Sequence, residues 1–125
     1  AIMVGGSIVA TQTTFDCSSL PICHSGPSMA SWLHGIHRIL GVSMLLATSA
    51  LALKLWIQGD RTPYFRTALC VSLLILAQIG IGSTAIVLDV PNELRIAHVG
   101  LGAMIWWGMV GMWALNPGTL PNHRG

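Results

Sequence analysis

Three long apolar segments dominate the chain, and polar residues gather at their ends. They cover residues 28–57, 63–88 and 92–115. Each is apolar on all sides, which is typical of a membrane helix rather than of an amphipathic surface helix. Each is also long enough to cross a bilayer, which takes about 20 helical residues. No segment alternates strictly between apolar and polar positions, so the chain is predicted to be all-α.

The chain opens on a further apolar segment, residues 1–12, which is too short to span a bilayer. Ten helical residues rise only about 15 Å, half of the hydrocarbon core. We expect this segment to be the outer half of a first spanning helix whose earlier residues precede Ala1. The predicted fold is an integral-membrane four-helix bundle that forms a single domain over residues 1–125.

The composition favours a membrane protein over a soluble domain or a nucleic-acid-binding protein. Apolar residues make up 53% of the chain and charged residues 8%, whereas a typical soluble domain has about 25% charged residues. The net charge of +2 is small and no basic patch exists, so we expect no nucleic-acid partner.

The basic residues orient the predicted spans. Lys54, Arg61 and Arg66 lie around the connection between the second and third spans, and Arg124 follows the last span. Positive residues concentrate on the cytoplasmic side. We therefore expect a multi-pass protein of a prokaryotic plasma membrane, with the Lys54–Arg66 loop and the C-terminus in the cytoplasm and the loop over residues 11–27 outside.

Two histidines lie inside the apolar spans, where ionisable side chains are costly and usually functional. His37 and His98 are expected about 9–14 Å below the outer surface, from the rise per helical residue. Their two spans run in the same direction, so the imidazoles can face each other at one level. Two such imidazoles suit the axial ligation of a haem iron. The alternatives are packing residues or part of a proton path.

Three other residues complete the predicted site. His34 lies one turn outward of His37 on the same face, as a proton donor, an alternative ligand or a hydrogen-bond partner. Arg95 lies one turn outward of His98, where its guanidinium could meet a haem propionate. Arg38 is about 100° round the helix from His37, so it needs another partner, such as a propionate or a neighbouring helix.

Glycines flank both histidines and lower the helix surface beside them. They either admit a flat macrocycle or simply allow close helix packing. These glycines are Gly35, Gly41, Gly100 and Gly102.

The predicted outer loop holds two cysteines, Cys17 and Cys23. Thiols outside the membrane tend to oxidise, and a five-residue spacer containing a proline can bring two Cα atoms to disulfide distance. The alternatives are two free, redox-active thiols or a metal site that includes His24. Cys70, in the third span, is expected to be buried and inert.

Three stretches carry a resemblance to a known family. Residues 5–26 read GGSIVATQTTFDCSSLPICHSG, residues 37–41 read HRILG, and residues 77–98 read AQIGIGSTAIVLDVPNELRIAH, with Gln78 and Gly82. In this order and spacing, the stretches resemble the haem A synthase family over nearly the whole chain.

The resemblance implies a fold and an activity. Members usually have eight spans in two pseudo-symmetric halves, each with a histidine pair for one haem, and this chain resembles the half-length form found in archaea. The implied reaction oxidises a ring methyl of haem O to the formyl group of haem A. By the same resemblance, His37 and His98 ligate iron, and Cys17 and Cys23 form the outer-loop disulfide.

The chain departs from the family pattern at two places. His34 stands where many members have a glutamate, and Val9 with Ala10 stand where an arginine is common. A histidine can replace a carboxylate as a base near neutral pH. Because one half supplies one histidine pair, a homo-oligomer is expected to provide a second site.

The leading hypothesis is therefore an oxidoreductase, a haem A synthase that holds haem b, haem O or haem A. In it His37 and His98 bind the iron, Arg95 and Arg38 contact the haem, and His34 handles protons. Haem O synthase and a terminal oxidase are the expected partners. The alternatives are a non-enzymatic b-type cytochrome with the same histidine pair, and a helical subunit without haem.

Overall fold

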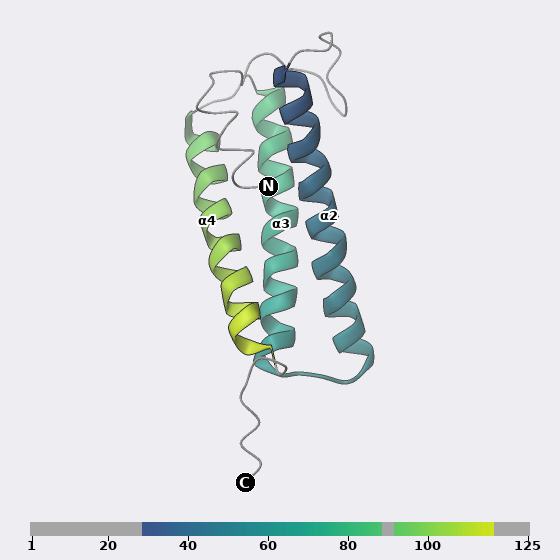
Figure 1. Cartoon of the computed structure of the whole chain (residues 1–125). Coiled ribbons are helices and arrows are strands. Elements are labelled where there is room, and N and C mark those ends of the chain that lie inside the picture. Colours follow the sequence, from purple (N-terminus) through teal and green to yellow (C-terminus); the bar gives the residue numbers. More distant parts are fainter. Residues whose placement is uncertain (1–28, 89–91, 117–125) are drawn as a thin grey trace.

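The computed structural model describes residues 29–88 and 92–116, and this part of the chain is all-α (Figure 1). Its helices are α2 (Met29–Ile57), α3 (Pro63–Val87) and α4 (Asn92–Leu115). Their bounds agree with the predicted second, third and fourth spans to within one residue. The segment over residues 1–12, predicted as a first span, lies outside the described residues.

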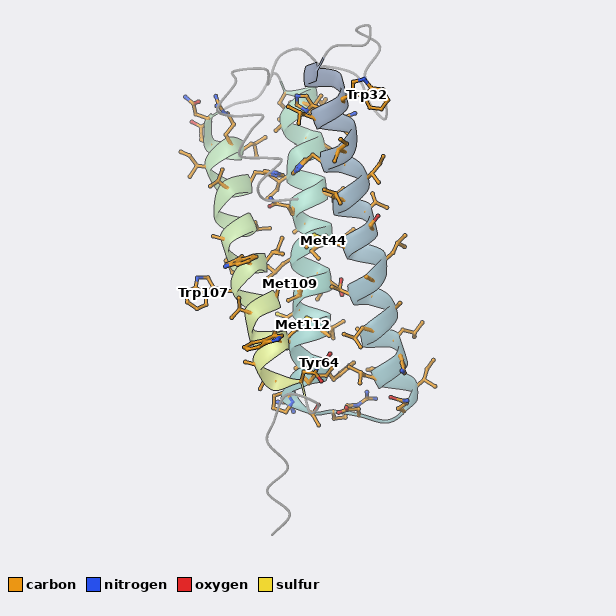
Figure 2. The ribbon with its side chains drawn as sticks, viewed as in Figure 1. Trp32, Met44, Tyr64, Trp107, Met109 and Met112 are labelled. Carbon is orange, nitrogen blue, oxygen red and sulfur yellow. The ribbon has the colours of Figure 1, made fainter. Side chains whose placement is uncertain are left out.

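All three described helices are long and apolar enough to cross a membrane. Most of their large apolar side chains point outward, as expected where lipid rather than water surrounds the bundle. Figure 2 shows Trp107 directed away from the bundle, and its side chain is 75% exposed. The chain is thus a multi-pass membrane protein. Its exposed tryptophans are Trp32, Trp56, Trp106, Trp107 and Trp113.

The helix α3 is central and packs against both α2 and α4 (Figure 1). The flanking helices begin at one end of the bundle and run in the same direction, while α3 runs back between them. We name this end, where α2 and α4 begin, the histidine end. The opposite end, where residues 58–62 connect α2 to α3, is the turn end.

The tightest packing lies between the middle of the bundle and the turn end. Val71, Ile75 and Ile105 form its buried centre. Partly buried methionines fill the space around this centre, and Figure 2 shows three of them, Met44, Met109 and Met112. Because lipid is as apolar as these side chains, close van der Waals packing rather than exclusion of water holds the helices together.

A glycine motif ends α2 at the turn end. The amide of Gly59 donates to the carbonyl of Trp56, and the amide of Asp60 donates to the carbonyl of Leu55, both at 3.0 Å. Gly59 has a φ of 73°, a left-handed conformation that glycine adopts without steric cost. This pattern is a Schellman motif, which pairs carbonyl groups that a helix end leaves unsatisfied.

Side chains then fix the turn against α3. The amide of Thr62 donates to Oδ1 of Asp60 at 2.7 Å. The guanidinium of Arg61 lies 3.9 Å from the ring centre of Trp56 and 5.2 Å from that of Phe65. These cation–π contacts connect the end of α2 to the start of α3, so the turn end is closed by specific contacts.

The expectation that Cys70 is buried is wrong. Its side chain is exposed on the outside of α3, while the next two residues, Val71 and Ser72, are buried. Successive helical residues are about 100° apart, so only some positions of α3 can face its two neighbours. A span that is apolar on all sides does not reveal which positions these are.

Candidate functional site

The structure brings His37 of α2 and His98 of α4 together at the histidine end. Their ring centres are 6.3 Å apart, and the ring planes are tilted by 60°. Both side chains are half-buried. The two helices begin at the same end of the bundle, on either side of α3 (Figure 1), so counting residues from each start correctly predicted a common level along the bundle. The two imidazoles are neighbours at one level, as predicted, and their ligation of haem iron stays a prediction.

The two helices carry the same local pattern at this level. Gly41 follows His37 by four residues, and Gly102 follows His98 by four residues. Because residues four apart share a helix face, each histidine has a glycine one turn nearer the turn end. A Cβ atom added at Gly41 would meet no heavy atom within 4 Å, so open space adjoins the histidine pair on the α2 side.

The imidazole of His98 rests against α3. A Cβ atom added at Gly82 would lie 3.1 Å from Cε1 and 3.4 Å from Nδ1 of His98, and no other atom lies within 4 Å. Any larger residue at position 82 would therefore push the ring. The edge that carries Nδ1 faces α3, and Nε2 lies farther from Gly82. Nδ1 is buried and has no hydrogen-bond partner among the described residues.

One residue of the site, Gln78, was not predicted as a site residue from the sequence. Gln78 of α3 was named only as part of a family motif, yet its amide nitrogen would lie 3.5 Å from a Cβ atom at Gly102. Its amide oxygen is buried without a hydrogen-bond partner in the described part of the chain. The available signal was a polar amide in the middle of an apolar span, where polar groups usually have a function.

The other predicted site residues lie within one helical turn of the pair along α2 and α4. His34 lies one turn nearer the start of α2, and Arg95 lies one turn nearer the start of α4. Both are half-buried, as is Arg38 beside His37. His34 and Arg38 each have interactions of their own. The predicted disulfide cysteines, Cys17 and Cys23, lie outside the described residues.

The donor set suits haem better than a closed metal site. Over residues 29–88 and 92–116, no three His, Cys, Asp or Glu side chains cluster to hold an ion, whereas structural zinc takes four such ligands. If both imidazoles held one metal ion, with metal–nitrogen distances of about 2.0 Å, their ring centres would lie about 6 Å apart. The observed 6.3 Å agrees with that separation.

The 60° tilt between the ring planes would not prevent His37 and His98 from holding one haem iron, because each ring could rotate about the bond that it would make. A Cβ atom added at Gly41, one turn from His37, would meet no heavy atom within 4 Å, so no side chain fills that position. The residues present therefore fit a haem held between His37 and His98.

The fold and site define a class: a helical membrane protein with two intramembrane histidines that face each other across the bundle. The chain belongs to the COX15-CtaA family, described as cytochrome oxidase assembly protein, whose family model matches residues 1–110. This is the haem A synthase family that the sequence motifs resemble, so that prediction is confirmed. No curated protein and no solved structure matches the chain.

Proposed function

We propose that the chain is a haem A synthase, which oxidises a ring methyl group of its substrate haem O to the formyl group of haem A. The observation that carries the proposal is the facing pair His37 and His98, with ring centres 6.3 Å apart. Family membership over residues 1–110 gives the reaction class. The product would serve the assembly of a terminal oxidase in a prokaryotic plasma membrane.

The two histidines hold the haem iron in this proposal. A bound haem supplies the one-electron chemistry that amino-acid side chains lack. His98 presents its ring from a fixed place because Gly82 of α3 supports one edge. His37 presents its ring from the opposite helix, and Gly41 keeps the adjoining space open. The pair thereby orients the macrocycle relative to all three described helices.

His34 is the proposed proton acceptor. Conversion of a methyl group to a formyl group with oxygen from water releases four electrons and four protons, so the electrons must pass to an external acceptor and the protons must leave the site. His34 stands one turn from His37 at the edge of the bundle, where many family members carry a glutamate. An imidazole can accept a proton near neutral pH, so His34 takes the place of the carboxylate.

The arginines are proposed to hold the propionates. Arg95 is half-buried one turn before His98, near the start of α4. A guanidinium binds a carboxylate through two parallel hydrogen bonds. This contact would direct the propionates toward the histidine end and fix the rotation of the macrocycle. Arg38, beside His37, serves a second carboxylate or a neighbouring helix.

The cysteine pair and the topology complete the proposal. Cys17 and Cys23 form a disulfide in the loop outside the cell, and residues 54–66 face the cytoplasm. A second copy of the chain provides a second histidine pair, because longer members of the family carry two. Haem O synthase would supply the substrate.

The test is production of haem A in a bacterial host that makes haem O but no haem A. The wild-type chain is expected to yield haem A, identified by chromatography and mass. His37→Ala and His98→Ala are expected to yield none, because each removes an iron ligand. Met104→Ala, which alters a lipid-facing residue of α4, is the matched control and is expected to leave the yield unchanged.

The His34 assignment has its own variants. His34→Glu restores the family carboxylate and is expected to keep activity, whereas His34→Ala is expected to lose most of it while retaining haem. Equal product from His34→Ala and the wild type would contradict the role of His34.

One observation favours a second function. Because His34 replaces the family glutamate, the same pair could hold haem b in a non-enzymatic electron-transfer cytochrome. A purified chain that carries only haem b, in a host rich in haem O and without any haem A, would support this cytochrome and contradict the synthase.

A further inference from the structure

Two buried polar atoms lie on the facing sides of α3 and α4 without hydrogen-bond partners among the described residues. They are the amide oxygen Oε1 of Gln78 and the ring nitrogen Nδ1 of His98. Buried polar atoms in native proteins are almost always paired, with protein or with ordered water. The two atoms are also complementary, because an amide oxygen accepts a hydrogen bond and a protonated Nδ1 donates one.

Glycines place these two side chains at neighbouring levels of one interface. The ring of His98 rests on Gly82 of α3, and the amide of Gln78 rests on Gly102 of α4. Gln78 and Gly82 are one turn apart on α3, as are His98 and Gly102 on α4. Each polar side chain thus occupies the space that a glycine of the other helix leaves free.

We propose that Gln78 is a positioning residue for His98, and that its amide oxygen receives the hydrogen bond of Nδ1–H through one bridging water molecule. The inference rests on the proposed haem site. A buried water needs two or more polar partners, and a bridging water holds two groups nearly as well as a direct hydrogen bond.

This arrangement decides which nitrogen of His98 is available. A hydrogen bond from Nδ1–H fixes the tautomer in which Nε2 carries the free lone pair. Nε2 lies farther from Gly82 than Nδ1 does, so the free lone pair is on the side of the ring away from that contact. Partners of this kind also raise the basicity of a ligating histidine, which favours ferric over ferrous iron.

The test is a reductive titration of the purified chain loaded with haem b, followed by its visible spectrum. Gln78→Glu keeps the shape of the side chain and strengthens the acceptor. It is expected to shift the equilibrium toward ferric iron by about tenfold, which corresponds to a potential lower by about 59 mV. Gln78→Leu removes the acceptor, so the potential is expected to rise and haem affinity to fall by about 10- to 100-fold.

Ser72→Ala is the matched control. It removes another buried polar group of α3, whose hydroxyl donates to the carbonyl of Ala68 at 2.9 Å, and it is expected to leave the potential unchanged. If the leucine variant does not fold, the potential of the isosteric glutamate variant alone tests the inference. A wild type that binds haem through two imidazoles, with both Gln78 variants matching Ser72→Ala, would overturn this inference alone. A wild type that binds no haem would instead overturn the proposed function.

Discussion

Glycine serves different purposes in α2 beside His37 and in α4 near the turn end. A Cβ atom added at Gly41 would meet no heavy atom within 4 Å, whereas one added at Gly108 would lie 2.5 Å from Cγ2 of Val71. Val71 is only 1% exposed, so Gly108 is needed for the approach of α4 to α3. Gly108 thus lets two helices approach each other near the turn end, whereas Gly41 leaves the position one turn from His37 unfilled.

This contrast explains how a small bundle can be both rigid and open. The contacts of Val71, Ile75 and Ile105 set the rotation of α3 and α4, and the capped turn after Gly59 fixes α2 relative to α3. Since these elements continue to the other end, His37 and His98 are placed without dense packing around them. The positions of His37 and His98 are therefore maintained even though the space beside His37 is unfilled.

The largest expected effect comes from filling that space. Gly41→Leu places a bulky side chain one turn from His37, on the same face of α2, so we expect haem binding to fall by at least about 10- to 100-fold. A Cβ atom at this position would meet no heavy atom within 4 Å, so thermal stability in detergent should change much less than haem binding. The measurement is haem content per protein, from the visible spectrum.

The matched control for this prediction is Gly35→Leu. Gly35 also has no atom within 4 Å of an added Cβ, but it lies about 200° round α2 from His37. Its haem content should equal that of the wild type. Equal loss of haem in both variants would contradict the assignment of Gly41 to the site.

The second prediction concerns the packed half. Gly108→Ala creates a contact of 2.5 Å with Cγ2 of Val71, and overpacking of this kind costs about 1–3 kcal/mol. We expect a lower midpoint of thermal unfolding with an unaltered haem spectrum. Val71→Ala in the same chain should recover part of the loss, because it removes the methyl group that the new side chain meets. A changed haem spectrum in Gly108→Ala would mean that packing near the turn end also controls the geometry of the histidine end.

Much of the fold could be predicted because membrane helices are defined by length and hydropathy. The helices over Met29–Ile57, Pro63–Val87 and Asn92–Leu115 agree with the predicted spans, and a fixed rise per residue gave His37 and His98 a common depth. Depth depends only on counting residues, so it could be read directly from the sequence.

Rotation about each helix axis could not be predicted in the same way. Cys70 was expected inside and lies outside, and Gln78 was not recognised as a neighbour of Gly102. Because these spans are apolar on every side, the sequence marks no inner face. Contacts such as the one between Gly108 and Val71 choose that face, and they exist only once the helices are packed.

The third prediction tests the support that α3 gives to His98. Gly82→Ala would put a Cβ atom 3.1 Å from Cε1 of His98, so the ring must shift by a few tenths of an ångström. We expect haem to remain bound with altered electron paramagnetic resonance g-values, which respond to the orientation of axial imidazoles. Gly80→Ala, at an open position of the same helix, should leave the g-values unchanged. Identical spectra for both variants would show that Gly82 does not set the ring.

The smallest expected effect lies at the turn end, in the pH dependence of the α2–α3 turn. The backbone N–H of Thr62, followed by its side chain, lowers the pKa of Asp60 below its ordinary value of 3.8. A lowered carboxyl pKa stabilises the folded chain above the unfolded pKa, and this contribution is lost as pH falls through the folded pKa.

Asp60→Asn should therefore reduce the drop in thermal stability between pH 7 and pH 3, because an amide at position 60 keeps an acceptor for Thr62 but does not titrate. Glu93→Gln is the control for simple loss of charge. Glu93 is an exposed carboxylate in the first turn of α4, at the histidine end. Since Asp60 is half-exposed in the connection between α2 and α3, solvent screens its interactions, and the difference should be small. If Asp60→Asn loses as much thermal stability at low pH as the wild type, the acid sensitivity does not originate in the turn. The rigidity of the turn end would then come from the Schellman motif and the Arg61 contacts alone.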